Sequence, residues 1–522
     1  MTLSLSVPAP RSLSKEAETS PKKAKQWVET LPLTKAVESA HQMIHAIEAL
    51  NRVKLPAEER MVLIDIYRPT IATILEELEA IYSHSAVPLP AKPREAFNLS
   101  RQLLIECSYT YKILLLDKVD KRILFNAKKS LPPLIYRVFE CLQGLVLQNY
   151  KTYQPAPPGV WQEMHQLYEY AEMQALLNEM IENNTKSTLA DIYHETAMIA
   201  LADPYRFKPS DIERIIVLIK QNRGMIDIHA PKAETALAKC FIIELDTDHP
   251  PKMLIPGHKI GQKLRVINTH RLVERLGQAV KKGATSGVAE KKRASLEVED
   301  LMLCLIQLWG NPSQRQSSRT QMESGIALCC GIRAIAHFIE QDAREDIDAE
   351  IDIEAIRVGH TIPLLKIPQD PLSQQLGIEK SLVVNQSVNG LRLQRDPLGK
   401  LDIKIGEVVG VRFIGASSWH IGVVRWLTLL EETILEFGVE LIANSATAIT
   451  IEPTLSAAKP QPALLLASEQ AELPPDELLT LPDTFNDLRE FRLNDGDKNF
   501  KVRALTLVEK SSRFDLFQFK PS

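Results

Sequence analysis

The hydrophobic residues of this 522-residue chain recur with two different periods, and the change of period limits what the chain can fold into. From about residue 25 to residue 222, apolar side chains such as Val62, Ile66 and Ile74 return at the spacing of one helix face. After residue 385 they alternate in short runs between Gly-containing turns, which is typical of antiparallel strands. The sequence therefore predicts a multidomain α+β protein with its helices first and its strands last.

The helical part is expected to cover residues 25–229. Pro56, followed by Glu58 and Glu59, predicts the start of one of its helices. Two architectures fit the pattern, a packed helical bundle and a tetratricopeptide-like array of helix pairs, and no fixed repeat period decides between them. Residues 1–24 are rich in Ser, Pro and Ala, and we expect them to form a disordered tail.

Three further regions follow the helices. Residues 230–297 predict a small α/β connector and linker, with a strand at Cys240–Leu245 and a helix at Thr269–Val280. Residues 298–455 predict a closed antiparallel β-barrel, because short strands there follow one another quickly. After a Pro/Ala/Ser-rich linker, residues 456–522 predict a small C-terminal β module or an extension of the barrel.

The composition favours a soluble protein of the reducing cytoplasm. The net charge is only −4, so no strong field attracts nucleic acid or an acidic membrane surface. Most of the six cysteines lie in apolar runs without a CxxC motif, which favours buried thiols. No run approaches the ~20 apolar residues that cross a bilayer. The basic segment from Lys281 to Arg293 lacks interleaved aromatic residues, so a solvated linker is favoured over a nucleic-acid contact.

One turn carries most of the chemical information. Asn385-Gln-Ser-Val-Asn-Gly390 lies between two strand-like runs and contains a carboxamide, a hydroxyl at Ser387 and a glycine. Such a turn offers side-chain donors and acceptors, and it offers backbone N–H groups to a polar ligand. Upstream, Arg315 and Arg319 place two guanidiniums four residues apart.

Together these two motifs resemble the signature of the PilZ family, RxxxR followed by (D/N)xSxxG, whose small β-barrels bind cyclic di-GMP. Gly406-Glu-Val-Val-Gly410 and Gly438-Val-Glu-Leu-Ile442 resemble further strands of that family, and the resemblance covers about residues 313–451. It implies cyclic di-GMP as the ligand and no cofactor. It also implies a set of ligand contacts: Arg315, Arg319, Asn385, Ser387 and Gly390.

The chemistry of the implied contacts suits this ligand. Guanidiniums fork onto phosphate oxygens and onto guanine O6 and N7, and they stack on purine faces. Two departures from the family pattern stand out. The gap between Arg319 and Asn385 is longer than one strand and one turn, and Gln314 stands where many strong binders have another arginine.

Other candidate residues carry weaker signals. Trp419 or Trp426 could stack on a guanine, although a tryptophan in the barrel core is the simpler interpretation of each. His41 and His45 are spaced like metal ligands on a helix, and an exposed helix face is favoured over a metal site. His194-Glu195 begins like a zinc-protease motif, but Met198 occupies the second histidine's position.

The sequence and the resemblance favour a non-enzymatic receptor for cyclic di-GMP. The helical domain is then expected to pass the signal to a protein partner, without nucleic-acid binding or membrane insertion. The alternative is a structural scaffold whose barrel does not bind nucleotide. A hydrolase is disfavoured, because no set of acid, base and metal-binding residues is evident.

Overall fold

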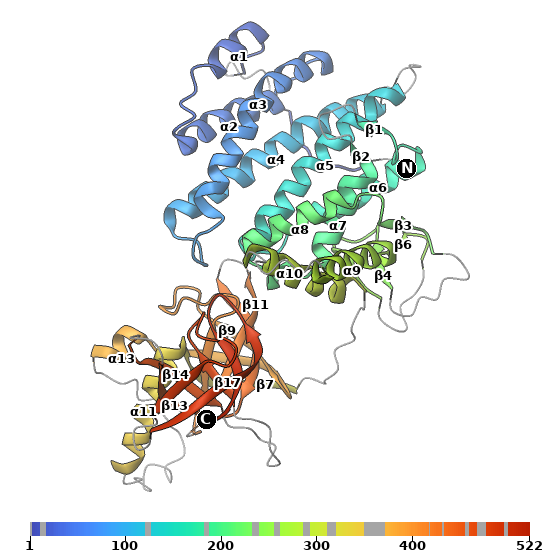
Figure 1. Ribbon diagram of the computed structural model, residues 1–522. Coiled ribbons are helices and arrows are strands. Elements are labelled where there is room, and N and C mark those ends of the chain that lie inside the picture. Colours follow the sequence, from blue (N-terminus) through green and yellow to red (C-terminus); the bar gives the residue numbers. More distant parts are fainter. Residues whose placement is uncertain are drawn as a thin grey trace. The chain divides into compact units, whose positions relative to one another are not determined.

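The computed structural model describes residues 3–10, 17–120, 127–181, 187–231, 240–254, 261–285, 293–310, 320–348, 371–416, 418–430, 433–454, 459–466, 477–494 and 499–522. The chain divides into two compact units, Met1–Gln314 and Arg315–Ser522, which have hydrophobic cores of their own. The first is mainly helical and the second mainly β (Figure 1). The order of helices and strands predicted from the two hydrophobic periods is confirmed.

The helices of the first unit follow the predicted period: α1 (Pro21–Val28), α2 (Ala36–Arg52), α3 (Ala57–Tyr82), α4 (Ala91–Asp120), α5 (Ala127–Lys151), α6 (Val160–Met173), α7 (Leu189–Leu201) and α8 (Pro209–Gln221). Helix α3 starts directly after Pro56, as predicted, and continues through Pro69. Helix α4 packs against α2, α3 and α5. Lengths range from 8 residues in α1 to 30 in α4, which favours a packed bundle over a uniform array.

The beginning of the chain is not the expected disordered tail. Leu3 and Leu5 are only 5% and 8% exposed and belong to the core of the helical unit, whereas Ser4 and Ser6 are exposed. An extended chain points successive side chains to opposite sides, so the Leu-Ser-Leu-Ser alternation buries one side of it. The prediction of disorder over residues 1–24 is therefore wrong for residues 3–10, which we call the N-terminal strap, and for α1.

The α/β connector is confirmed as a small antiparallel sheet with two helices. Its elements are β3 (Asp227–His229), β4 (Phe241–Glu244), β5 (Lys252–Met253), β6 (Leu264–Asn268), α9 (His270–Thr285) and α10 (Arg293–Gly310), with strand order β3-β6-β4-β5. The first unit also contains the strand pair β1 (Met180–Ile181) and β2 (Ser187–Thr188) and the short 3₁₀ helix η1 (Pro204–Arg206), which contact α5 and α7.

Helix α10 belongs to the first unit and not to the barrel. It packs against α9, and the Trp309 indole N–H donates to the Met198 carbonyl at 3.2 Å. Trp309 is 1% exposed within the helical core. The expected start of the barrel domain at residue 298 therefore differs from the structure, because the apolar side of this helix is buried against helices that precede it in sequence.

The second unit begins with a closed six-stranded antiparallel barrel. Its strands are β7 (Thr320–Cys330), β8 (Glu379–Ser387), β9 (Gly390–Arg395), β10 (Val408–Phe413), β11 (His420–Leu430) and β12 (Ile434–Ala443), in the order β10-β11-β12-β9-β8-β7. Strand β7 pairs with β10 and closes the barrel. Leu391 and Leu393 are buried while Arg392 between them is half-buried, which is the alternation expected of a filled barrel.

The C-terminal β region is a second closed barrel. It consists of β13 (Ala446–Pro453), β14 (Gln461–Leu466), β15 (Glu477–Thr480), β16 (Glu490–Asn494), β17 (Asn499–Lys510) and β18 (Asp515–Pro521), in the order β13-β14-β15-β18-β17-β16. Strand β13 pairs with β14 and β16, so the second barrel starts at Ala446 and not after residue 455. This difference arises because Ala443 and Ala446 are separated by only two residues, with no linker to mark the change of barrel.

Helix α11 (Ile332–Asp348) and the short α13 (Pro371–Leu376) lie between β7 and β8 in sequence. Helix α11 contacts β7 and β10 of the first barrel and β13 and β14 of the second. The acidic stretch 341–354 is expected to be an exposed loop or helix face. Within its described part, Asp342 instead turns inward and accepts hydrogen bonds from Arg412 and from the Trp419 indole. None of the described helices combines the length and the apolar character that a membrane crossing requires.

Candidate ligand-binding site

The Asn385–Gly390 segment forms the tight connection between β8 and β9. Ser387 pairs with Gly390, which leaves Val388 and Asn389 as a two-residue hairpin loop. The Leu441 N–H donates to the Asn389 carbonyl at 2.9 Å and fixes the loop against the end of β12. A side chain at position 390 would place its Cβ 3.1 Å from Ser387 Oγ, so the Ser387 hydroxyl would have to shift by a few tenths of an ångström.

Strand pairing extends this turn into a transverse row on the outer face of the barrel. Gln321 of β7 pairs with Asn385, and Asn385 pairs with Arg392 of β9. Arg392 pairs with Gly438 of β12, and Gly438 pairs with Trp426 of β11. Directly paired residues share one face of a sheet. The neighbours of Arg392 and Gly438 in their own strands are buried in the barrel, so the row faces outward.

The carboxylate of Glu436, two residues before Gly438 on β12, holds the guanidinium of Arg392 in place. Glu436 is 4% exposed, and its Oε2 accepts from Arg392 Nη2 and from Gln394 Nε2, each at 2.8 Å. The Nε of Arg392 is buried and has no hydrogen-bond partner among the described residues. A guanidinium fixed in this way presents its remaining N–H donors in one orientation.

The two tryptophans of the barrel have different surroundings. Trp419 is 3% exposed, and its indole N–H donates to Asp342 at 2.7 Å, while the guanidinium of Arg412 lies 4.9 Å from its ring centre. Trp419 is therefore buried as expected, but it packs between the barrel and the helix that carries Phe338 and Asp342, and not inside the barrel. Trp426 is half-buried and lies across Gly438, where a Cβ would be 1.9 Å from its Nε1. Only glycine leaves room for the indole at this position.

Arg425, beside Trp426, connects the two barrels. Its guanidinium contacts both carboxylate oxygens of Glu509 on β17, at 2.6 and 2.8 Å, and Glu440 on β12 at 2.6 Å. Burial alone would lower the pKa of Arg425, but the hydrogen bonds and charges of Glu509 and Glu440 outweigh it and raise the pKa. Arg425 is therefore a structural cation that is already neutralised.

Arg315 and Arg319 lie outside the described residues. The strand that follows them is described, and its first residue, Thr320, pairs with Gln386 in the β8–β9 hairpin. The long gap between Arg319 and Asn385 contains β7, α11 and α13, and β7 still pairs with β8 across it. The insertion therefore leaves the barrel closed, although the gap is longer than one strand and one turn.

The other sequence candidates do not form a site. Among the residues with described coordinates, no group of three His, Cys, Asp or Glu side chains could hold a metal ion. His41 is exposed on α2 and lies 3.7 Å from the carboxylate of Glu95. Burial lowers the pKa of His194 to about 4, and Glu195 is engaged by Arg223 at 2.7 Å.

Arg392 is a residue of this face that was not among the sequence candidates, whereas Trp426 was considered there as a residue that could stack on a guanine. Arg392 follows Gly390 by two positions, so strand alternation places both on one face, and this signal was available. Trp426 and Gly438 are brought together only by the pairing of β11 with β12, which the sequence spacing does not reveal.

Three models of one protein family match the chain in succession. The N-terminal domain of the cyclic-di-GMP receptor FimW matches residues 22–233, its middle PilZ domain matches residues 240–346 and 368–448, and its C-terminal β-barrel domain matches residues 446–522. The chain belongs to this family of cyclic-di-GMP receptors. The PilZ resemblance inferred from the two motifs is confirmed, and the last match begins where β13 begins.

One relative extends the similarity over most of the chain. The cyclic-di-GMP receptor FimW of Pseudomonas aeruginosa PAO1 is 25% identical in an alignment 498 residues long that covers 85% of this chain and 81% of the relative. The similarity therefore extends well beyond the barrel that carries the two motifs.

Proposed function

We propose that the first barrel binds cyclic di-GMP on its outer face, across the row from Gln321 to Trp426. The observation that carries this proposal is the row itself, which brings the Asn385 carboxamide, the Arg392 guanidinium and the Trp426 indole onto one surface. Ser387 and Gly390 pair two residues further along the same two strands and lie beside Asn385 and Arg392. Carboxamide, guanidinium and aromatic groups are those that read a guanine edge and stack on its face.

The charges of this face indicate where the phosphates bind. Arg392 is paired with Glu436, and Arg425 is paired with Glu440 and Glu509, so these cations are largely neutralised. Two phosphates carry two negative charges, and their neutralisation needs further cations. We assign this role to Arg315 and Arg319, which precede Thr320 at the end of β7 beside the hairpin. Ser387 then completes the phosphate contacts, and Asn385 and Arg392 read guanine.

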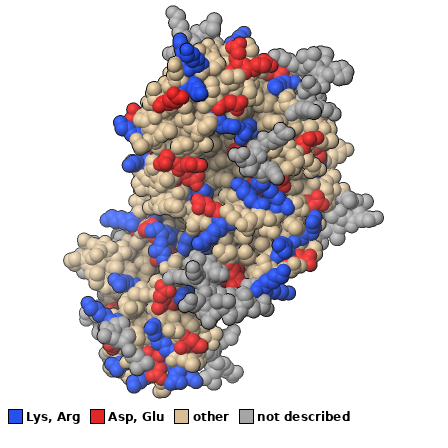
Figure 2. All heavy atoms as spheres, turned by 45° about the horizontal axis from the view of Figure 1, so that its top comes forward, with Lys and Arg blue, Asp and Glu red and all other residues tan. Residues whose placement is uncertain are grey.

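We further propose that the protein acts in the cytoplasm as a receptor without enzymatic activity. The arginine segment also joins the two compact units, since the division between them falls at Gln314 and Arg315. A ligand that holds this segment restricts the joint, and the helical unit passes that change to a protein partner. Lysine, arginine, aspartate and glutamate side chains are interspersed on the face shown in Figure 2, which does not favour nucleic acid as that partner.

The test is calorimetric titration of the full chain with cyclic di-GMP, GMP and cyclic di-AMP. We expect binding of cyclic di-GMP alone, without product formation. Arg392→Ala should weaken it by about 10- to 100-fold, as expected for a lost charged hydrogen bond of about 1.5–3 kcal/mol. Arg315→Ala and Arg319→Ala should have similar effects, and Asn385→Ala and Ser387→Ala smaller ones.

Arg492→Ala is the matched control, because Arg492 is a half-exposed arginine of the second barrel with a 3.7 Å ion pair to Glu452. Absence of any heat with the parent protein would favour the alternative function, a scaffold whose barrel does not bind nucleotide. Binding that is unchanged in Arg392→Ala and Asn385→Ala would place the ligand elsewhere.

A further inference from the structure

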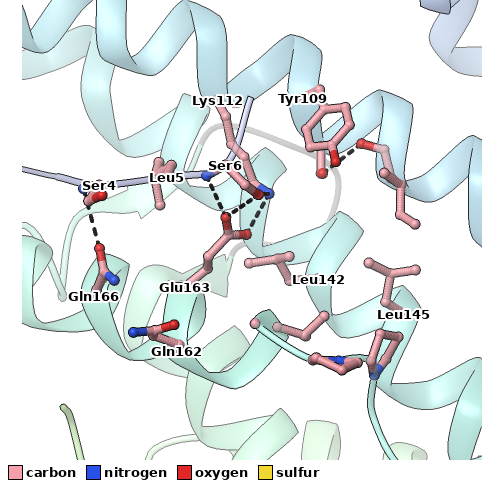
Figure 3. A pocket seen from close by; sticks show the side chains of 16 residues that line it. Ser4, Leu5, Ser6, Tyr109, Lys112, Leu142, Leu145, Gln162, Glu163 and Gln166 are labelled. Carbon is pink, nitrogen blue, oxygen red and sulfur yellow. Dashed lines mark hydrogen bonds and ion pairs between the residues drawn. The ribbon is translucent and has the colours of Figure 1, made fainter. Parts of the chain in front are cut away.

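The N-terminal strap lies in a groove of the helical unit that is formed by α4, α5 and α6. Leu3 and Leu5 insert into the helical core, and the serines between and after them remain exposed. Figure 3 shows Lys112 of α4 and Glu163 of α6 pointing toward one another beside Ser6. The strap therefore lies between helices that are about 100 residues or more away from it in sequence.

Side chains of the groove bind the main chain of the strap. Gln166 Oε1 accepts from the Ser4 N–H at 3.3 Å, and Glu163 Oε1 accepts from the Ser6 N–H at 2.7 Å. These two acceptors are three residues apart on α6, and residues at this spacing are neighbours on a helix surface. The groove thus accepts hydrogen bonds from the N–H groups of alternate residues in an extended chain. Main-chain hydrogen bonds of this kind provide affinity in sites that recognise extended peptides.

A buried ion pair keeps the second acceptor in position. Lys112 and Glu163 are 2.5 Å apart, and their side chains are 3% and 10% exposed. Glu163 also accepts a 2.6 Å hydrogen bond from the Ser6 hydroxyl. Because the cation and the carboxylate neutralise each other, this part of the groove favours a hydroxyl-bearing segment over a strongly charged ligand.

The strap does not fill the groove. A cavity of about 420 Å³ remains beside Ser4, Leu5 and Ser6. Its walls combine apolar and polar side chains: Ile105, Leu142, Leu145, Val160, Tyr109 and Gln162. A segment with a larger apolar side chain at the position of Leu5 would bury more surface here than the strap does.

We propose that this groove is a docking site for an extended segment of a partner protein and that the strap occupies it in cis. The fitting segment has apolar residues at alternate positions and a serine or threonine after the second one, as in Leu3-Ser-Leu-Ser6. This specifies the partner-binding role proposed for the helical unit, and it does not depend on ligand binding by the barrel. Because the strap occupies the groove for part of the time, the apparent affinity for the partner equals the intrinsic affinity multiplied by the fraction of molecules in which the groove is free.

The test uses a fluorescently labelled peptide with the sequence of residues 2–10 and the full-length chain. Leu3→Asp combined with Leu5→Asp should release the strap, because both leucines are buried. We expect the peptide to bind this variant at least tenfold more tightly than the parent. Val7→Asp is the matched control, since it adds a charge to the same strap at a side chain that is 39% exposed, and it should behave like the parent.

Two outcomes of the peptide titration would contradict the proposal. Equal peptide binding to the parent and the released variant, or no binding to either, would overturn it. If the Leu3→Asp, Leu5→Asp variant does not fold, Ser6→Pro is used in its place. Proline has neither the N–H nor the hydroxyl that donate hydrogen bonds to Glu163, and both leucines are kept. On the parent, excess peptide should accelerate hydrogen exchange at Ser4 and Ser6, and unchanged exchange at saturating peptide would contradict displacement. No nucleotide is present, so failure here leaves the ligand proposal intact.

Discussion

Gly438→Ala tests the outer face of the first barrel directly. A Cβ at this position would lie 1.9 Å from Trp426 Nε1, 2.4 Å from Cε2 and 2.6 Å from Cδ1. Carbon contacts need about 3.5 Å, so the indole has to move by roughly 1.6 Å. The backbone of Gly438 is not among the left-handed glycines, so alanine causes no conformational strain there. The effect of the substitution is therefore steric.

The expected cost follows from this displacement. Overpacking of this kind typically destabilises a protein by about 1–3 kcal/mol, and the half-buried indole can move outward, which places the effect toward the lower end. For a unit of this size each kcal/mol lowers the melting temperature by about 2–4 °C. We expect thermal denaturation to show a decrease of about 2–8 °C. Calorimetry should show cyclic di-GMP binding weakened at least tenfold, because the stacking surface has moved.

A double-mutant cycle separates the clash from other effects. Combining Gly438→Ala with Trp426→Ala removes the indole that the new methyl group meets. The double variant should therefore lose less unfolding free energy than the two single variants lose together, whereas its binding of cyclic di-GMP should stay weak. Gly277→Ala is the control, because nothing lies within 4 Å of its added Cβ, and it should not lower the melting temperature. Parent-like melting and binding of Gly438→Ala would show that Trp426 does not lie across this glycine in solution.

Three further predictions concern the junction, the helix insertion and pH. Hydrogen exchange over residues 311–320 should slow on addition of cyclic di-GMP, and protection confined to the β8–β9 hairpin would exclude coupling through the junction. Asp342→Asn removes the anion that Arg412 and the Trp419 indole share, so it should destabilise the second unit by about 1–3 kcal/mol in denaturant unfolding. Burial lowers the pKa of His165 and His194 to about 4, so the unfolded state takes up protons first. The free energy of unfolding should then fall from about pH 6.5 toward pH 4, by up to about 3 kcal/mol per histidine. The melting temperature of His194→Gln should depend less on pH than that of the parent.

Local sequence patterns predicted the elements of the site but not their neighbours. The Asn385–Gly390 turn was predictable, because two alternating runs flank a segment with Ser, Asn and Gly, and the structure confirms it as a hairpin. The row that continues from Asn385 to Trp426 depends on the register of β9, β12 and β11. Register is set by contacts across strands that are far apart in sequence, so spacing alone does not contain it.

The same distinction accounts for the two misplaced segments. The period of residues 298–309 correctly predicts a helix, but it does not say which core the helix joins, and Trp309 packs in the first unit. The strap was predicted as disordered from its Ser, Pro and Ala content. Only two leucines oppose that composition, and their burial depends on a groove formed by helices much later in the chain.

The insertion between β7 and β8 explains why two barrels form one compact unit. Helix α11 contacts strands of both barrels, and residues of both contribute to one hydrophobic cluster that includes Ile335, Phe338, Leu464 and Leu516. The Phe338 and Trp419 rings stack at 6.0 Å between centroids, and Arg425 with Glu509 adds a bidentate ion pair between the barrels. An insertion that only lengthened a loop would cost closure entropy and contribute nothing in return. This one buries apolar surface against both barrels, so the long interval between the two sequence motifs stabilises the unit and leaves the first barrel closed.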